Sequence, residues 1–458
     1  MDRRDFLAAS AAVIFVRPLS WHAVDPKLRE LQRAVDGPVL LPGKPGYATA
    51  RLTYNARYDK HPIAVVQPLD ADDVRAVVRW ARKYDVPVAP RSGGHSYAGY
   101  SSGTGVVVDL SRFTGVHVSG SAAVVGPATR LIDVYAALRA HDATIPAGSC
   151  PTVGLGGHAL GGGVGFASRK LGTVSDNVLS VVAVTGEGKL VQANAQSHPD
   201  LFWALRGGGG RNFAIVTSFR LKLAHVTGGS WFVATLPWSS APDVVRNWQA
   251  WAPTADPRLF SICRLAGTTL QVFGQFMGTE TQLKATLPPW LAGATTGSAS
   301  YFDLIRRWAG CLNETLPECR ALHRTAFAAK SDYVDHVMPK QAVETMQTWV
   351  ARGLGSLLID SYGGALRHGP GAFAHRNALC SMQYYTSWTG DGAAQLAWLR
   401  GFHAAMRPFV SGGAYINYID PDLRTGYRAA YYGSNAARLV TVRKKYDPDR
   451  VFRFPQAV

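Results

Sequence analysis

The sequence predicts an α+β fold of two domains, and three observations support that prediction. From Pro62 onward, short β-branched runs alternate with stretches whose apolar residues recur at helical spacing, which is typical of helices packed on sheets. Two glycine-dense blocks, 91–105 and 148–172, interrupt this first part of the chain. Beyond Val226 the glycines become sparser, and tryptophans with longer helical patterns appear. A chain of 458 residues is long enough for two or three domains with separate cores.

These changes in composition place the domain boundaries. We expect a first domain over residues 30–225 and a second α+β domain, a sheet covered by helices, over residues 226–415. Short turns return near "GGAYINYID", so residues 416–458 are expected to be a C-terminal segment that returns to the first domain.

The elements of the first domain follow one another in a regular order. "PIAVVQP" predicts a strand, and a helix with Asp70 or Asp72 as its N-cap follows it. The expected buried face of that helix consists of Val74, Val77, Val78 and Ala81. "VPVAP" predicts the strand that leads into the first glycine block. Further along, "RLIDVYAALRAH" predicts a helix, and "NVLSVVAVTGEGKLVQAN" predicts a β-hairpin that turns at Glu187-Gly188.

Both glycine blocks are suited to holding a phosphate group. Backbone without side chains lets main-chain N–H groups approach an anion closely. Neither block follows a strand as GxGxxG or matches GxxxxGK[ST], although "GGHALGGGVG" comes close to a dinucleotide pattern. The blocks therefore indicate either a nucleotide-binding site or turn-rich packing, and the lone His95 lies inside the first of them.

The amino-terminal stretch MDRRDFLAASAAVIFVRPLSWHA resembles a twin-arginine export signal. Arg3 and Arg4 precede a short alanine-rich apolar run, residues 7–16, which is too short to cross a bilayer. We expect a signal over residues 1–23, read by the twin-arginine export machinery, and a periplasmic or secreted protein without a membrane span. The alternative for this stretch is a frayed amphipathic start.

Charge and cysteine content narrow the classes of partner and site. Lys and Arg total 48 against 31 for Asp and Glu, but the net charge of +17 is scattered along the chain. This predicts a basic, solvated surface that suits an anionic cofactor and argues against nucleic-acid binding. Of the five cysteines, Cys311 and Cys319 are placed to pair in an oxidising compartment. Neither CxxC nor HxxxH occurs, so no metal site is expected.

Longer stretches of the sequence resemble one family. "RSGGHSYAGYSSGTGVVVDLS", "GSCPTVGLGGHALGGGVGFASRKLGTVSDNV" and "DLFWALRGGGGRNFAIVTSF" are similar to the berberine bridge enzyme-like flavin oxidases of the vanillyl-alcohol oxidase superfamily. The tail "YYGSNAARLVTVRKKYDPDRVFRFPQAV" resembles that family's closing motif, and the resemblance covers residues 35–458. It implies a PCMH-type FAD-binding domain followed by a substrate domain, in a bacterial protein exported through the twin-arginine machinery.

The resemblance also implies that FAD is attached twice, through His95 of GGH and Cys150 of G-x-C-P. A neutral imidazole and a thiolate are the nucleophiles suited to an electron-poor ring. A hydrogen-bonded loop histidine and a small buried cysteine are the alternatives. The other residues expected to contact FAD are Arg91, Ser92, Gly93, Gly94, Ser96, Gly148, Val153, Gly154, Gly157, His158, Gly162, Gly163, Gly165, Val216, Tyr415 and Asn417. Val153 matches the family's oxygen-gating position, where a valine favours an oxidase over a dehydrogenase.

Hydride removal from an alcohol needs a base for the hydroxyl proton. "GAYINYID" resembles the family's Y-x-N segment, which makes Tyr415 the expected base, with a phenol whose pKa must be lowered. In some relatives a lysine lowers it, but Ser381 stands at that position here, so Asp360 of "DSYGG" is the alternative partner. The expected pocket residues are Tyr97, Tyr362 and Gln383. Packing and capping roles are the alternatives for all of these side chains.

The resemblance predicts an FAD-dependent oxidase, with dioxygen reduced to hydrogen peroxide. The expected substrate is a small-molecule alcohol, such as a carbohydrate hemiacetal or a secondary alcohol, and the protein is expected to be a monomer. One alternative is a secondary metabolite, a glycosylated polyketide or an alkaloid, oxidised by the same chemistry. Another is an exported binding protein without catalysis.

Overall fold

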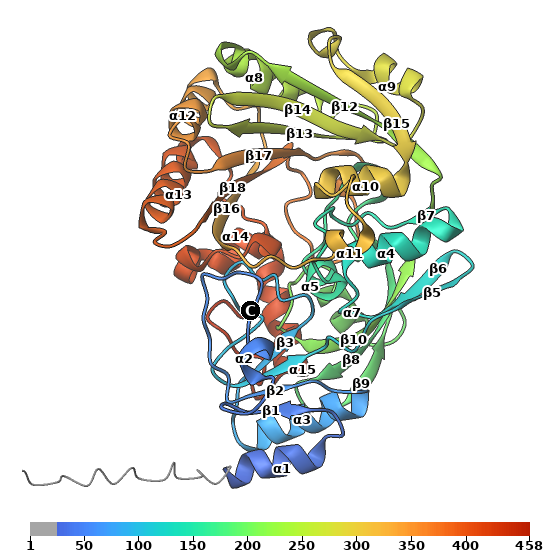
Figure 1. The fold of residues 1–458 in the computed structure, drawn as a ribbon, viewed down its shortest axis with the longest axis vertical. Coiled ribbons are helices and arrows are strands. Elements are labelled where there is room, and N and C mark those ends of the chain that lie inside the picture. The colour runs from blue at the N-terminus through green and yellow to red at the C-terminus, as the bar shows by residue number, and fades with distance from the viewer. Residues whose placement is uncertain (1–24) are drawn as a thin grey trace, which may run out of the picture.

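The computed structural model describes residues 25–458, so the predicted signal lies outside the described residues. Figure 1 shows two parts, with the first half of the chain below and a large sheet with its helices above. Helices and sheets occur in both parts, which confirms the predicted α+β class.

Two sheets form the first part. The first sheet is ordered β1 (Val39–Leu40), β2 (Ala64–Val66), β4 (Val106–Asp109) and β3 (Val88–Arg91). The second is ordered β5 (Val116–Ser119), β6 (Ala122–Val125), β10 (Ala214–Lys222), β8 (Val178–Thr185) and β9 (Leu190–Ala193). A short pair joins β11 (Ala224–His225) to β7 (Ala143–Thr144). Val184 of β8 pairs with Leu190 of β9, which confirms the predicted hairpin.

The helices of this part are amphipathic or short. They are α1 (Pro26–Ala34), α2 (Tyr47–Ala50), α3 (Ala71–Lys83), α4 (Leu131–Leu138), α5 (Leu155–Leu160), α6 (Ser168–Leu171) and α7 (Pro199–Ala204). The carboxylate of Asp70 caps α3 by accepting from the amides of Asp72 and Asp73. The predicted apolar face of α3 is fully buried, so the helical spacing was interpreted correctly.

One antiparallel sheet of seven strands organises the second part. Its order is β15 (Thr295–Ser300), β12 (Gly228–Leu236), β14 (Thr269–Phe276), β13 (Leu259–Ala266), β17 (Ser356–Ser361), β18 (Cys380–Trp388) and β16 (Ala326–Val334). Its helices are α8 (Ala241–Trp251), α9 (Glu280–Thr286), α10 (Tyr301–Ala309), α11 (Leu316–Cys319), α12 (Lys340–Val350) and α13 (Ala393–Met406).

The two faces of this sheet have different neighbours. Helices α8, α12 and α13 cover one face (Figure 1), where Leu357 and Ile359 of β17 are fully buried. Side chains alternate along a strand, so Leu358 and Asp360 point to the opposite face, which lines a cavity.

The C-terminal segment packs against the first part. It contains α14 (Tyr427–Tyr432) and α15 (Ala436–Tyr446). The amide of Val88 donates to the carbonyl of Val451 at 2.9 Å, and the amide of Val458 donates to Oδ1 of Asn212 at 3.1 Å. The chain end is therefore held beside the glycine-rich region (Figure 1).

Three further features bear on the sequence predictions. Cys311 and Cys319 form a disulfide. Across residues 25–458, none of the helices is long and apolar enough to traverse a membrane. In the same range, no cluster of three His, Cys, Asp or Glu side chains is arranged to hold a metal ion.

Candidate active site

A cavity of about 500 Å³ is lined by both parts of the chain. The two glycine segments line it from the first part, and the open face of the seven-stranded sheet lines it from the second. Residues 415–419 of the C-terminal segment also line it. One cavity therefore collects side chains that are far apart in the sequence.

The two glycine segments meet backbone to backbone beside this cavity. A Cβ added at Gly93 would come within 2.3 Å of the amide nitrogen of Gly154. Among the described residues, no hydrogen bond is donated by the consecutive main-chain N–H groups of residues 93–97, although these residues line the cavity. Free amides at a cavity wall form an anion-binding arrangement. This segment therefore fits the diphosphate of the FAD that the resemblance implies.

His95 is fixed from two sides at the cavity wall. Its Nε2 lies 3.0 Å from Oγ1 of Thr152, and the ring of Tyr54 stacks on it at a centroid distance of 4.0 Å. Burial lowers the pKa of His95 to about 4. The imidazole is therefore neutral near pH 7 and keeps a lone pair for bond formation.

Cys150 begins a tight turn that ends at Val153. The amide of Val153 donates to the carbonyl of Cys150 at 3.4 Å, and Pro151 takes the second position of the turn. The Cys150 side chain is exposed to the open space of the cavity. The surrounding protein nevertheless raises the pKa of its thiol, while main-chain groups of Thr152 and Val153 and the Thr152 side chain lower it. Burial outweighs these groups, so the thiolate, which is the nucleophilic form, is less favoured than in a free cysteine.

Tyr415 presents its hydroxyl group to the cavity between two donors. The oxygen accepts from the amide of Gly163 at 3.1 Å and from Nδ2 of Asn417 at 2.9 Å. Gly163 has φ +80°, and an added Cβ would lie 2.9 Å from the His158 ring, so glycine is required there. Burial raises the pKa of Tyr415 to about 12, and these two hydrogen bonds oppose the rise. Protein groups alone thus do not give the lowered pKa that the sequence analysis requires of a base.

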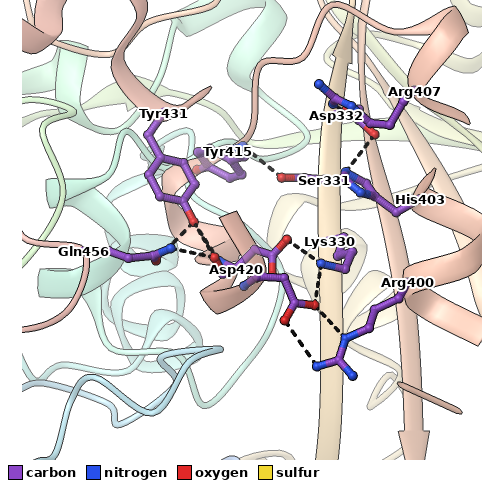
Figure 2. A network of polar contacts seen from close by, with 11 residues as sticks. Lys330, Ser331, Asp332, Arg400, His403, Arg407, Tyr415, Asp420, Tyr431 and Gln456 are labelled. Atoms are coloured by element: carbon purple, nitrogen blue, oxygen red, sulfur yellow. Dashed lines mark hydrogen bonds and ion pairs between the residues drawn. The ribbon is translucent and has the colours of Figure 1, made fainter. Parts of the chain in front are cut away.

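The main chain at Tyr415 is held by the edge strand β16. The amide of Tyr415 donates to Oγ of Ser331 at 2.9 Å, and Lys330 Nζ donates to Oδ2 of Asp420 at 2.7 Å. Figure 2 shows both contacts, with Tyr431 and Gln456 bonded to the main chain of Asp420.

Lys330 and Asp420 form a buried ion pair. Their side chains are 5% and 6% exposed, and Asp422 adds a second carboxylate 2.8 Å from the same nitrogen. Arg400, which is 54% exposed, pairs with Asp422 at 2.9 Å. Lys330 and Ser331, which are neighbours on β16, thus hold the segment from Tyr415 to Asp420 at two points.

Asp360 faces the same cavity from β17. Burial raises the pKa of its carboxyl group to about 7. When ionised, Asp360 raises the pKa of Tyr415, so it does not supply the activation that was considered from the sequence.

A polar contact also joins the first glycine segment, residues 91–105, to the seven-stranded sheet. Nε2 of Gln383 donates to the hydroxyl of Tyr97 at 3.0 Å. The ring of Tyr97 stacks on Tyr418 at 5.2 Å and meets Phe327 edge-on at 4.9 Å. Tyr97 therefore connects β18 with the Tyr415 segment.

Most of the predicted site residues line the cavity. They are Ser92, Gly93, Gly94, His95, Ser96, Tyr97, Gly148, Cys150, Val153, Gly154, Gly157, His158, Gly165, Val216, Asp360, Gln383, Tyr415 and Asn417. His158 holds the second segment together, because its Nε2 accepts from the amide of Gly148 at 3.0 Å.

Four predicted residues are not among those that line the cavity. Arg91 points away and forms a buried ion pair with Asp109 at 2.9 Å. Tyr362 lies behind the cavity, fully buried, with its hydroxyl 3.3 Å from that of Tyr333. Gly162 and Gly163 act through their backbone.

Much of the cavity wall was not predicted from the sequence. The additional lining residues include Tyr54, Phe166, Phe260, Ile262, Phe327, Leu358, Tyr385 and Tyr418. Alternation along β13, β17 and β18 would have separated cavity-facing from helix-facing positions, but only once the strand bounds were known.

Comparison with known proteins matches two family descriptions. Residues 62–194 match "FAD binding domain", and residues 414–458 match "Berberine and berberine like". An uncharacterized FAD-linked oxidoreductase of Bacillus subtilis, YgaK, is 31% identical over 453 residues, covering 92% of this chain and 96% of the relative. The xylooligosaccharide oxidase of Thermothelomyces thermophilus is 30% identical over 491 residues, covering 99% and 98%.

A solved structure shows the same fold. The Physcomitrella patens BBE-like 1 protein superposes with a TM-score of 0.87 at 32% identity, covering 94% of this chain and 98% of that one. This confirms the PCMH-type fold and makes the chain an FAD-linked oxidoreductase, in place of the binding protein considered as an alternative. With cavity, motifs and fold in agreement, the chain belongs to the berberine bridge enzyme-like family of FAD-binding oxidoreductases.

Proposed function

We propose that this enzyme oxidises an alcohol group of a carbohydrate, at a hemiacetal or secondary alcohol carbon, and uses dioxygen as the final acceptor. One observation carries the proposal: His95, Cys150 and Tyr415, from three separate segments, line one cavity. FAD held there would supply the hydride acceptor, and dioxygen would receive the two electrons as hydrogen peroxide.

The protein side of the reaction is the transfer of a hydroxyl proton. Tyr415 is the proposed base, because the Gly163 amide and Asn417 both donate to its oxygen and stabilise the phenolate. Asp360 is the second candidate, because a carboxyl group with a pKa near 7 accepts a proton readily at neutral pH. Gln383 and Tyr97, which share a hydrogen bond at the cavity wall, are proposed to orient the substrate.

His95 and Cys150 are proposed to hold the cofactor by two covalent bonds. The neutral imidazole and the cavity-facing thiol have the chemistry that such bonds require. The remaining contacts would come from the free amides of residues 93–97 and from the second glycine segment.

The choice of dioxygen as acceptor rests on Val153. A grass pollen protein, Phl p 4, is named a glucose dehydrogenase, and so is its variant with asparagine replaced by histidine. With a further isoleucine-to-valine change, the variant is named a glucose oxidase. A small side chain at Val153, on the cavity wall, is therefore proposed to admit dioxygen.

A second substrate class is favoured by the apolar wall of the cavity. Phe166, Phe260, Ile262 and Leu358 form this wall, and aromatic groups bind well to such surfaces. One relative is named a monolignol oxidoreductase. A glycosylated polyketide or an alkaloid would use the same wall.

We also propose that the protein acts outside the cytoplasm as a monomer, exported by the twin-arginine machinery. The disulfide between Cys311 and Cys319 supports an oxidising location.

Two measurements test the proposal. Acid-precipitated protein should remain yellow, and the denatured chain should carry the mass of one FAD. Peroxide release should then be measured on oligosaccharides, monosaccharides, phenolic alcohols and alkaloid alcohols. A chain without added mass would refute the attachment, and peroxide from the phenolic or alkaloid panel alone would favour the second substrate class.

A further inference from the structure

Thr152 lies between the two residues proposed to hold FAD. Its Oγ1 is 3.0 Å from Nε2 of His95, and it is two residues from Cys150 in the same tight turn. Thr152 also counteracts the effect of burial on Cys150, because its main-chain and hydroxyl groups lower the pKa of that thiol.

The position of Thr152 is fixed by its surroundings. The amides of Leu131 and Ile132, at the start of α4, donate to the carbonyls of Val153 and Pro151 at 2.9 and 3.3 Å. Thr152 itself is 6% exposed. The turn is therefore docked on a helix end, and the hydroxyl group has little freedom to move away.

Which atom donates and which accepts between Thr152 and His95 depends on the ring nitrogen that carries the proton. Nε2 of His95 is the ring nitrogen that faces Thr152, and a threonine hydroxyl can accept from it or donate to it. With the proton of the neutral ring on Nε2, the other nitrogen, Nδ1, carries the lone pair. The hydroxyl then accepts from Nε2–H, its own hydrogen is free to donate to the Cys150 sulfur, and the Nδ1 lone pair is left for reaction.

We propose that Thr152 is the positioning residue for both attachments, accepting from Nε2–H of His95 and donating to the sulfur of Cys150. The inference rests on the proposed double attachment of FAD. Attachment at His95 forms a C–N bond at Nδ1, breaks a C–H bond of the cofactor and releases the Nε2 proton, and attachment at Cys150 replaces S–H and C–H by C–S. Each step releases two protons and two electrons, which dioxygen takes up as hydrogen peroxide.

Three variants of the full chain test this role. Thr152→Val replaces the hydroxyl group by a methyl group of similar size. Thr152→Ala also removes the hydroxyl group and leaves a smaller side chain, and Thr152→Ser keeps the hydroxyl group. Each chain is made under riboflavin limitation and mixed with FAD, and the mass of the denatured chain is followed over time. We expect incorporation to be about tenfold to a hundredfold slower in the valine and alanine variants, as for a reacting group that loses a hydrogen bond. The serine variant should stay close to the parent.

A second readout does not depend on FAD attachment or on activity. The rate at which iodoacetamide modifies Cys150 is measured against pH in the flavin-free chains, with Cys150→Ala as the background for Cys263 and Cys380. The titration midpoint should move to higher pH in the valine and alanine variants and not in the serine variant.

The two readouts separate the inference from the proposed function. If the parent chain gains no mass, the double attachment fails, and the thiol titration still judges Thr152. Parent-like incorporation or a parent-like titration midpoint in both hydroxyl-free variants would overturn the role of Thr152. A matched melting temperature across the variants shows that the comparison concerns folded protein.

Discussion

The two sides of the cavity are built in different ways. One side, proposed to hold the cofactor and called the cofactor side, comes from two short glycine-rich segments with free amides at residues 93–97 and close contact between their backbones. The other, proposed to meet the substrate and called the substrate side, comes from single side chains on β13, β16, β17 and β18, which span residues 259–388. The first side is local in the sequence, whereas the second exists only after four strands have been aligned.

This difference determines which side-chain substitutions each side of the cavity tolerates. On the cofactor side, side chains at Gly93 or Gly163 would meet backbone or the His158 ring at 2.3–2.9 Å. On the substrate side, each cavity-facing residue alternates with one that packs under the helices, as Leu358 does with Leu357. The cavity face can therefore change while the covered face maintains the fold.

The largest effect is expected where the two sides meet, at Tyr415. Tyr415→Phe keeps the ring and removes the oxygen that Gly163 and Asn417 bind, so reduction of the flavin should slow about 10²–10⁴-fold. Rapid-mixing absorbance measures this step, and the attachment of FAD proposed at His95 and Cys150 should be unaffected. Tyr418→Phe, in the neighbouring ring, is the control with a much smaller loss. A normal rate in Tyr415→Phe would assign the base to Asp360.

The next effect concerns the strand that holds the tyrosine segment. Lys330→Met leaves Asp420 buried without its partner, which should reduce the free energy of unfolding by about 3–5 kcal/mol. Arg400→Met removes a partner of Asp422. Because the Arg400 side chain is 54% exposed, this change should lower the free energy of unfolding by at most about 1 kcal/mol. Denaturant unfolding of the holoenzyme measures both. Equal losses would mean that the buried pair does not fix the segment.

Features that are local in the sequence could be predicted from it, whereas features that join distant residues could not. Helix α3, the hairpin of β8 and β9 and both glycine segments were predictable, because hydrophobic period and turn residues are local. The pairing of Lys330 with Asp420, 90 residues apart, was not, since only the fold brings them together. The pKa of Tyr415 was also beyond reach, because burial dominates it.

A smaller effect is expected in the pH dependence. The ionised Asp360 carboxylate raises the pKa of Tyr415, so Asp360→Asn should lower that pKa and move the rise in reduction rate to lower pH. Because the pKa of Asp360 is about 7, its carboxyl group is neutral at lower pH, so the parent and variant profiles should converge below neutrality. Reduction rates between pH 5 and 10 measure this. A loss of about 10²–10⁴-fold at every pH would instead identify Asp360 as the base.

The smallest effect should appear on the sheet face. Leu358→Ala removes apolar contact from the cavity wall, so KM should rise by about tenfold with kcat nearly unchanged, the size expected for a few lost methylene groups. Leu357→Ala, one residue earlier on the covered face, is the matched control: it should cost about 2–5 kcal/mol of stability and leave KM alone. Steady-state kinetics and unfolding of both variants separate the two faces. If KM is unchanged in Leu358→Ala for every alcohol that the enzyme oxidises, the substrate does not reach this wall, and the apolar residues belong to the cofactor side.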